Sequence, residues 1–537
     1  MVNKYTVLSL NCVTIVLLFK KSQIYRLKIK NLVLINMAKI LKDISRTFKE
    51  FLIVPGLTDK VHSVENIDLK TPLVKYKKGL EESKFSLNIP FVSAAMQAVS
   101  GQDLAIRLAR SGGLSFIFSS QSIEDQAEMV RVVKEHKAGF VKSDSNLSPE
   151  NTLQDALDLK KKTGHSTIAI TKNGEMNSKL LGILTDKDFW EFKDDLNSTI
   201  QDYFTPLEKL ILGKDGISLA EAIEILWKNK KECLPIIDSS GNLVSLVFRK
   251  DYYDHKSYPD EIVDDNKRLI VAAALNTHDY IQRAKVLIGA GADLFCLDSS
   301  DGYSHWQDKA IKELKQTYPD IVLGAGNVVS KEGFDYLVKS GADFVKIGIG
   351  GGSICTTRSQ KAIGRGQASA LIEVVQRRDE YFKETGIYVP VCSDGGLNSD
   401  TDIIVALALG SDFVMMGRYF AMCSESPTTK ITFKGLTYKP YWGEGAFRAK
   451  NWQRYKQKDN KLVFEEGVDA FVPLSGPLSE KVAKTVIKIK SAMCNIGVLN
   501  IEEFHKNSVL TQVSEMTLVE SGTSSVQNLD REIIGNS

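Results

Sequence analysis

Short apolar runs alternate with longer amphipathic stretches along most of this chain. The runs read "IPFVSAAM", "GLSFIF", "LIVAAAL", "DLFCLD", "IVLGAGN", "DFVKIG", "VPVCSD" and "DFVMMG". A short run that is apolar throughout is typical of a strand buried on both faces. Amphipathic stretches such as "TDIIVALALG" separate most of the runs and have the pattern of helices. The alternation therefore predicts eight parallel strands with helices between them.

One pattern repeats in three of these units, at residues 289–300, 339–350 and 407–419. Each copy has a glycine, an aspartate, a short apolar run and then a turn rich in glycine or serine. Glycine just past a helix end is the expected terminating residue, so each copy reads as the end of a helix followed by a strand. Eight such units predict a (β/α)8 barrel. A doubly wound sheet is the alternative, which the strand count disfavours.

The second and third predicted strands are separated by about 150 residues, far more than a normal strand-to-helix connection. Within this gap, residues 167–189 and 233–253 both read as strand, glycine turn, strand. A helical stretch precedes each copy, "TLQDALDLKKK" and "SLAEAIEILWKNK". We interpret residues 140–255 as an inserted pair of βαβ-type modules. The barrel would then comprise residues 37–139 and 256–537.

The first 36 residues differ in character from the rest of the chain. Residues 5–19 are apolar and precede two lysines, as in the core of a signal peptide, but they lead to no clear cleavage site. The run is also short for a membrane span. Met37 opens a more ordinary sequence. We interpret residues 1–36 as an upstream extension or a mis-assigned start, with a targeting segment as the alternative.

Composition narrows the class of protein. The chain of 537 residues is 43% hydrophobic and 25% charged, values typical of a globular enzyme. Its net charge of +3 is too small to indicate nucleic-acid binding. Seven cysteines without metal-ligand spacing indicate a reducing compartment, so we expect a cytoplasmic protein with neither membrane nor nucleic-acid partners. Cys296 and Cys392 lie in apolar runs, where a free cysteine acts as a small hydrophobe.

The richest candidate chemistry lies in "KIGIGGGSICTTR", from Lys346 to Arg358, which begins at the end of the sixth predicted strand and continues into the turn after it. Glycines let the backbone approach a ligand closely and adopt positive φ. Cys355 comes after them and is a candidate nucleophile, with Arg358 expected to favour its thiolate. A buried loop thiol is the alternative. The turns "SDGG" and "GRY" end strands seven and eight, at the barrel face where active sites lie.

These features resemble the inosine-5′-monophosphate (IMP) dehydrogenase family. "GIGGGSICTTR", "DGG", "YWGEG" and "NWQRY" occur in that family's order. The inserted pair matches its tandem cystathionine-β-synthase-type (CBS) modules, and the similarity runs from about Met37 to the C-terminus. The resemblance implies a TIM barrel with a CBS insertion and an active-site flap at about 430–475. It also implies a homotetramer that oxidises IMP to xanthosine monophosphate (XMP) with NAD, the step committed to guanine nucleotides.

The resemblance also implies roles for individual residues. Its catalytic set is Cys355, Thr357, Arg454 and Tyr455. Its IMP contacts are Met96, Ser353, Asp394, Gly396, Gly417, Arg418, Tyr441, Gly443, Glu444 and Glu466. Its NAD contacts are Asp298, Ser299, Ser300, Trp306, Asn327 and Gly348. Its potassium (K+) ligands are backbone carbonyls of Gly350, Gly352 and Cys355 and, from a neighbouring subunit, those of Glu520, Ser521 and Gly522.

Some positions depart from the family's pattern. Ser521 stands where glycine is usual, and His278 stands where some members stack an arginine on the adenine-binding aromatic. Trp306 is that aromatic, or else a core tryptophan. In the first CBS module, Thr185 and Asp188 match the end that binds adenine or guanine nucleotides. In the second module Phe248 replaces the threonine, which predicts that at least one nucleotide site is degraded.

Two other functions remain open. Guanosine monophosphate (GMP) reductase shares the barrel and "CTTR", but generally lacks the insertion and the arginine–tyrosine flap. A non-catalytic nucleotide sensor would need only the CBS pair. The presence of Cys355, Asp394 and Arg454 together argues against the sensor.

Overall fold

The computed structural model describes residues 6–10, 13–17, 38, 40–136, 140, 143, 145–163, 166–249, 258–264, 268–449 and 464–520. The chain divides into two units, residues 1–44 and 45–537. In the first unit, β1 (Thr6–Leu10) pairs antiparallel with β2 (Val13–Leu17). Both strands lie in the apolar run that we interpreted as part of an upstream extension.

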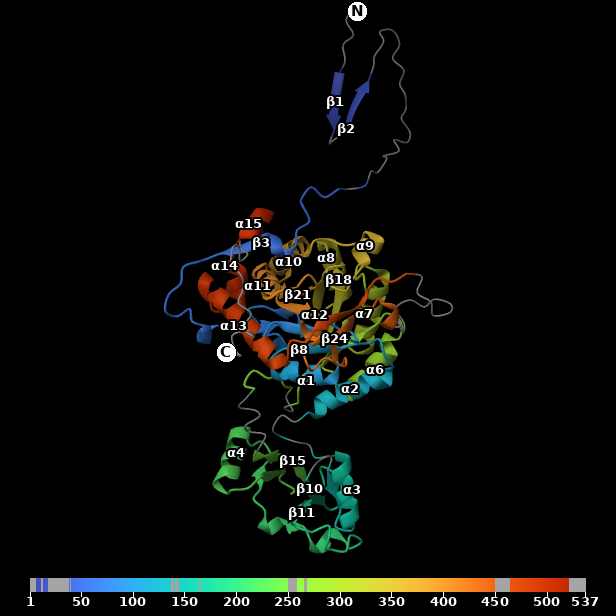
Figure 1. The fold of residues 1–537 in the computed structure, drawn as a ribbon, viewed down its shortest axis with the longest axis vertical. Helices are drawn as coiled ribbons and strands as arrows, with labels where there is room; N and C mark the ends of the chain where they lie inside the picture. Colours follow the sequence, from blue (N-terminus) through green and yellow to red (C-terminus); the bar gives the residue numbers. More distant parts are fainter. Residues whose placement is uncertain are drawn as a thin grey trace, which may run out of the picture. The chain divides into compact units, whose positions relative to one another are not determined.

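Eight parallel strands in the second unit close into a barrel (Figure 1). Each predicted apolar run supplies one strand, which confirms the predicted barrel and makes the doubly wound alternative wrong. In chain order the strands are β7 (Phe91–Ser93), β8 (Leu114–Ile117), β16 (Ala272–Leu275), β17 (Leu294–Leu297), β18 (Leu323–Val328), β19 (Phe344–Ile347), β21 (Val391–Asp394) and β22 (Phe413–Met416).

Helices come after the barrel strands, as the amphipathic stretches predict. Two of the helices end at the predicted glycines, Gly291 and Gly341, which adopt left-handed φ values of +96° and +117°. The helices are α1 (Gln102–Arg110), α2 (Ile123–Glu135), α6 (Tyr280–Ala290), α7 (His305–Thr317), α8 (Lys331–Ser340), α10 (Gln367–Thr385), α11 (Asp400–Ala408) and α13 (Leu478–Ile496).

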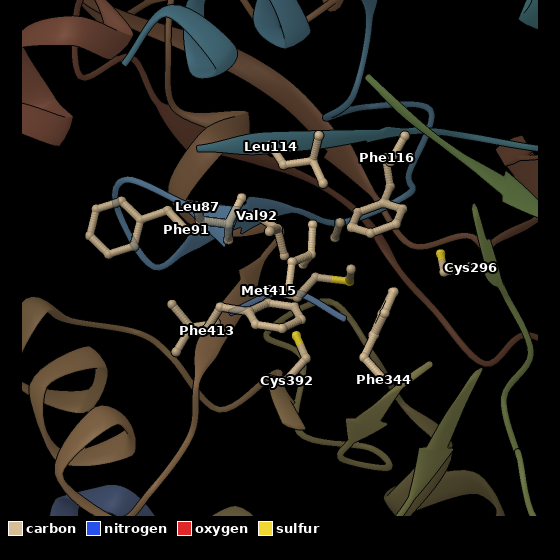
Figure 2. Close-up of a cluster of buried hydrophobic side chains, with 14 of the residues drawn as sticks. Leu87, Phe91, Val92, Leu114, Phe116, Cys296, Phe344, Cys392, Phe413 and Met415 are labelled. Carbon is tan, nitrogen blue, oxygen red and sulfur yellow. The ribbon is translucent and has the colours of Figure 1, made fainter. Parts of the chain in front are cut away.

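The barrel interior is packed with side chains (Figure 2). Phe344 lies between two other rings, 6.1 Å from the centroid of Phe116 and 5.7 Å from that of Phe413. Cys296 and Cys392 are fully buried in the same cluster. Burial raises the pKa of Cys296 to about 12, so it remains a thiol. These cysteines are therefore the small hydrophobes that their apolar runs predict.

The aspartate of the repeated pattern joins neighbouring barrel strands. In each copy its carboxylate accepts a hydrogen bond from a backbone N–H that lies at or next to the start of the preceding barrel strand. Each carboxylate is also paired with a buried or half-buried lysine or arginine. The N–H bonds run from Val271 to Asp293, from Leu323 to Asp343 and from Val391 to Asp412, at 2.7–2.8 Å, and the paired cations are Lys134, Lys315 and Arg378.

We expect Asp412→Asn to lower the free energy of unfolding by about 3–5 kcal/mol, because it leaves a buried cation without its buried counter-ion. Arg378 is 3.1 Å from Asp412, and both side chains are almost fully buried. Denaturant unfolding of the full chain measures the effect. Glu128→Gln, which breaks an exposed pair with Arg131, is the control and should cost less than about 1 kcal/mol. Equal losses in the two variants would contradict this explanation of the repeat.

The segment between β8 and β16 contains two copies of one unit. In the first copy, β9 (Asn146–Leu147), α3 (Leu153–Thr163) and β10 (Thr167–Thr171) form a parallel βαβ unit, followed by antiparallel β11 (Leu180–Thr185). The second copy has β13 (Gly213–Lys214), α4 (Leu219–Lys228), β14 (Cys233–Ile237) and β15 (Leu243–Phe248) in the same arrangement. A buried apolar cluster contains residues of both copies. The predicted pair of βαβ modules is therefore present.

After β22, three antiparallel strands form a separate small sheet. They are β23 (Ile431–Phe433), β24 (Leu436–Trp442) and β25 (Asp469–Pro473). The residues between β24 and β25 are described to Ala449 and again from Phe464. Arg454 and Tyr455 of the predicted flap lie outside the described residues. Among the residues that are described, no helix is both long and apolar enough to cross a membrane.

Candidate active site

A cavity lies at the C-terminal ends of the barrel strands and contains most of the residues predicted for the site. The predicted residues that line it are Met96, Asp298, Ser299, Ser300, Asn327, Gly348, Gly350, Gly352, Cys355, Thr357, Asp394, Gly417, Tyr441, Gly443, Glu444 and Glu466. The predicted residues outside its lining are Ser353, Gly396, Arg418, Trp306 and Glu520. Ser521 and Gly522, like Arg454 and Tyr455, lie outside the described residues.

The glycines before Cys355 allow two backbone segments to touch. Gly396 N–H donates to the carbonyl of Gly351 at 2.8 Å, joining the loop after β19 to the turn after β21. A Cβ atom on Gly348 would lie 2.1 Å from the carbonyl oxygen of Asp394, and Gly348 has a φ of +137°. Only glycine satisfies both conditions there. Close approach between the two loops therefore explains the glycine cluster.

Cys355 is half-buried and faces a hydroxyl group. Its Sγ lies 3.1 Å from Thr357 Oγ1. Arg358, which we expected to favour the thiolate, donates to the carbonyls of Ile349 and Arg365 and so braces the loop. Cys355 lines the cavity and is only partly buried, so a ligand in the cavity can reach it, and its role as nucleophile stays a prediction.

Behind Thr357 lies a buried carboxylate. Thr357 Oγ1 donates to Glu466 Oε2 at 3.1 Å, and Glu466 Oε1 lies 2.6 Å from Lys361 Nζ. A backbone contact joins the same two segments, since Thr356 N–H donates to the Glu466 carbonyl at 2.9 Å. The sequence analysis did not identify Lys361. Its place four residues after Thr357 was the available signal, because that spacing puts two side chains on one face of a helix.

Asp394 is paired with a buried ammonium group. Lys346, on β19, is 2% exposed, and its Nζ lies 3.5 Å from Asp394 Oδ2. Burial lowers the pKa of Lys346, but the nearby Asp394 and Asp298 carboxylates outweigh it and raise that pKa. Asn327 also donates to Asp394, at 3.0 Å. The sequence analysis missed Lys346, although a lysine inside an apolar strand signals a buried charge that needs a partner.

Tyr441 also lines the cavity and is almost fully buried beside Gly417. A Cβ on Gly417 would lie 2.7 Å from the Tyr441 hydroxyl oxygen. Burial raises the pKa of Tyr441 well above its usual value, although a hydrogen bond with Ser353 acts in the opposite direction. The phenol is therefore a neutral donor. Together with Ser353 and the backbone of the glycine turns, it suits an anionic group.

Gln97 is hydrogen-bonded to four residues around Met96 and Glu444. Its backbone N–H donates to Glu444 Oε1 at 2.6 Å, and its side-chain amide donates to the carbonyls of Ser120 and Ala449. Its amide oxygen accepts from Trp442 Nε1 at 3.1 Å. The sequence analysis missed Gln97, because its partners are brought together only by barrel closure.

The predicted NAD contacts are only partly gathered in the cavity. Asp298 comes after β17 and lines the cavity with Ser299 and Ser300. Trp306, on α7, is 66% exposed, so the core-tryptophan interpretation is wrong. Stacking of adenine on this ring stays a prediction. His278, in the loop before α6, is exposed.

For a monovalent cation, the cysteine loop offers backbone carbonyls, which are the oxygen ligands that potassium prefers. Gly350 has a left-handed φ of +71°, and the Gly352 carbonyl accepts from Cys355 N–H at 3.1 Å. In the part of the chain that the structure describes, no cluster of three or more His, Cys, Asp or Glu side chains could hold a metal ion. A cation at this loop would therefore depend on carbonyls.

Comparisons with known proteins agree on one family. A family model described as the IMP dehydrogenase / GMP reductase domain matches residues 45–524. An inosine-5′-monophosphate dehydrogenase of Tritrichomonas foetus is 50% identical over 497 residues, covering 92% of this chain and 99% of that protein. The enzyme of the same name from Schizosaccharomyces pombe is 36% identical and covers 86% of this chain and 87% of its own. That from Aquifex aeolicus is 34% identical, covering 90% and 95%.

A solved structure adds one correction. A cysteine-to-alanine variant of GMP reductase from Trypanosoma brucei, in complex with guanosine 5′-monophosphate, superposes with a TM-score of 0.79 at 28% identity. The match covers 90% of this chain and 98% of that one. The uncovered part of this chain is smaller than the segment 140–255, so at least part of that segment is matched in the GMP reductase. Although we expected GMP reductases generally to lack the insertion, its presence alone therefore does not exclude the GMP reductase alternative.

Proposed function

The chain belongs to the IMP dehydrogenase / GMP reductase family, and from that premise we propose that it oxidises IMP to XMP with NAD. The observation that carries the proposal is the cavity that Cys355, Asp394 and Asp298 share at the barrel's C-terminal face. The 50% identity with an IMP dehydrogenase over almost the whole chain favours this member of the family. The reaction commits IMP to guanine nucleotides.

Cys355 is the proposed nucleophile. An aromatic carbon gives up hydride reluctantly, so a group that adds to C2 of the purine must first make it tetrahedral and electron-rich. Cys355 Sγ forms that bond as a thiolate, while the electron pair of the C2=N3 double bond moves to N3, which takes a proton. When hydride leaves C2 and N3 loses its proton, the double bond re-forms and the purine stays attached to sulfur. NAD, when bound, supplies the hydride acceptor. Thr357, 3.1 Å from Sγ, holds the sulfur in the cavity.

The remaining cavity residues fit the rest of the nucleotide. Asp394, paired with Lys346, is proposed to accept bonds from the two ribose hydroxyls of IMP. The phosphate is proposed to lie against Ser353, Gly396, Gly417, Arg418 and Tyr441, where backbone amides and a neutral phenol converge. Met96, Gly443, Glu444 and Glu466 are proposed to contact the base. Asp298, Ser299 and Ser300 line the same cavity and can hold the ribose of NAD.

Hydrolysis of the sulfur-bound purine is proposed to use Arg454 and Tyr455. An arginine is a poor base in water because its pKa is so high. It therefore needs a preorganised site in which Tyr455 and Thr357 share the proton. Water adds to C2, the sulfur–carbon bond breaks, and XMP leaves with Cys355 restored as a thiol or thiolate.

Potassium activation and assembly are both explained if one potassium ion is bound between two subunits. Three carbonyls of the cysteine loop are too few to complete the coordination of potassium, so further carbonyls must come from elsewhere. We propose that Glu520, Ser521 and Gly522 of a neighbouring subunit supply them in a homotetramer. Potassium at this position would order the loop that carries Cys355. We further propose that the protein acts in the cytoplasm.

The inserted pair is proposed to be a CBS pair that binds a regulatory adenine or guanine nucleotide. Thr185 and Asp188 form a local turn, in which Asp188 accepts from the Thr185 backbone N–H at 2.6 Å and from its hydroxyl at 2.8 Å. Thr205 also donates to Asp188. Phe248, in the second copy, packs against the apolar cluster that both copies share. This asymmetry supports one intact nucleotide site at most.

NADH absorbance with IMP and NAD tests the proposed function. The expected result is steady NADH formation that depends on potassium and is weaker with sodium. Parallel reactions with GMP and NADPH test the GMP reductase alternative and should show no NADPH consumption. NADPH consumption with GMP, and no NADH from IMP, would assign the chain to the other branch of its family.

Deleting residues 140–255 is expected to change kcat by less than about ten-fold, that is, less than about 1.4 kcal/mol in activation free energy. The barrel's buried apolar cluster contains no residue of this segment, so the barrel keeps its core. NADH assays on the deletion variant and the full chain measure the effect. A variant that folds and binds IMP but makes no NADH would show that the insert takes part in catalysis.

A further inference from the structure

A chain of polar contacts leads from the Cys355 thiol to the surface. Cys355 Sγ contacts Thr357 Oγ1, which donates to Glu466 Oε2, and the other carboxylate oxygen faces the ammonium of Lys361. These three contacts measure 3.1, 3.1 and 2.6 Å. Each oxygen of Glu466 therefore has its own partner. Lys361 is the only member of this chain of contacts for which the proposed chemistry gives no role.

The burial of these groups shows why a cation is needed there. The Glu466 side chain is 7% exposed, whereas that of Lys361 is 36% exposed. A carboxylate taken out of water costs free energy unless a counter-ion or hydrogen bonds compensate it. Glu466 also lies in the cavity that holds Cys355, whose reactive form is itself an anion. Without compensation, two negative groups would lie in the same cavity.

Backbone contacts hold the two partners of this pairing next to each other. Lys361 and Thr357 are the last and first residues of the short helix α9 (Thr357–Lys361), so one element carries both partners of the carboxylate. Thr356 N–H donates to the Glu466 carbonyl, and Cys355 forms an isolated β-bridge with Gly467. Backbone contacts therefore join the segment of Cys355 and α9 directly to that of Glu466.

We propose that Lys361 is a positioning residue that holds the Glu466 carboxylate charged and oriented, with Oε2 on Thr357 and therefore next to Cys355. This inference rests on the proposed function, because Glu466 matters only if a purine binds beside Cys355. By holding Glu466 in place, Lys361 fixes the direction of the Thr357 hydroxyl, which donates to that carboxylate. It also fixes the position of the carboxylate that is proposed to contact the purine. Its own ammonium stays at the solvent side and touches no substrate.

The test is a double-mutant cycle on Lys361 and Glu466. The variants are Lys361→Met, Lys361→Arg, Glu466→Gln and the Lys361→Met/Glu466→Gln double variant. Two quantities are measured for each, the single-turnover rate of NADH formation and the affinity for IMP by calorimetry. Lys309→Met, which removes a lysine from an exposed pair with Glu313 on α7, is the matched control.

Lys361→Met is expected to lower the single-turnover rate, the IMP affinity or both by about ten-fold in the presence of Glu466. Lys361→Arg should recover most of that loss because it restores the charge. In the Glu466→Gln background the same substitution should change neither quantity by more than about two-fold, since no carboxylate remains to be held. Lys309→Met should match the wild type.

An equal loss in both backgrounds, or no loss in either, would overturn the inference. Affinity for IMP is measurable even if a variant does not turn over. The four variants can therefore still be compared by IMP affinity if Glu466→Gln is too slow for the rate measurement. A wild-type protein that makes no NADH from IMP would contradict the proposed function itself. If the wild-type protein makes NADH from IMP and Lys361→Met has the same single-turnover rate and IMP affinity, only this inference is contradicted.

Discussion

Cys355→Ala should abolish NADH formation, even in a single turnover, while IMP still binds. The substitution removes the only protein atom proposed to bond to C2, and hydride transfer from an unactivated aromatic carbon should be too slow to detect. In a serine protease, removing the nucleophile costs about 10⁶-fold in kcat, and we expect a loss of that order here. Rapid mixing of enzyme, IMP and NAD with detection at the NADH absorbance measures the first turnover.

The control for Cys355→Ala is binding. Asp394 is held in place by Lys346 and Asn327 and not by the thiol, so IMP affinity by calorimetry should fall by no more than about ten-fold. Cys296→Ala is the matched variant, because it removes a thiol buried in the barrel core and should leave the chemistry intact while lowering stability. NADH formation by Cys355→Ala would show that another group is the nucleophile.

Arg454→Gln should separate the two halves of the reaction. Hydride transfer needs Cys355 and bound NAD, whereas hydrolysis needs the group that activates water. Losing an activating group of this kind costs about 10²–10⁴-fold in the step that it serves. We therefore expect a rapid burst of NADH close to one per site, then very slow turnover. Intact mass after quenching should show the nucleotide attached to Cys355.

A burst that slows as much as turnover would contradict the role given to Arg454, because it would place that residue in hydride transfer or substrate binding. Arg448→Gln is the matched control. Arg448 lies near the same stretch of chain, but it pairs with Asp469 on β25 at 3.1 Å and stacks on Trp442. Its loss should leave both the burst and the turnover near wild-type values.

The barrel could be predicted because its strands are apolar on both faces and a glycine ends several of the helices between them. Those are local properties, visible in single runs such as "DFVMMG". The position of the site could be predicted from the same pattern, since Asp298, Asp394 and Gly417 come at or directly after strands that must end at one face. The individual roles came from the resemblance and not from the pattern.

Side chains that meet only after the barrel closes could not be predicted. Lys346 pairs with Asp394, Gln97 with Glu444, and Lys361 with Glu466, across separations of 48 to more than 300 residues. The contacts of Arg358 could not be predicted either, although its partners are close to it in the chain, and its effect on the thiol stays a prediction. Sequence spacing placed it near Cys355, but the fold directs its guanidinium to the carbonyls of Ile349 and Arg365.

The most direct test of the central claim uses IMP that carries deuterium at C2. The full-length wild-type protein is incubated with this substrate and NAD, and the NADH formed is analysed by mass spectrometry. If Cys355 activates C2 for hydride transfer, the NADH gains one deuterium and appears together with XMP in equal amounts. NADH without deuterium, or no NADH while IMP binds, would contradict the claim that this chain is an IMP dehydrogenase.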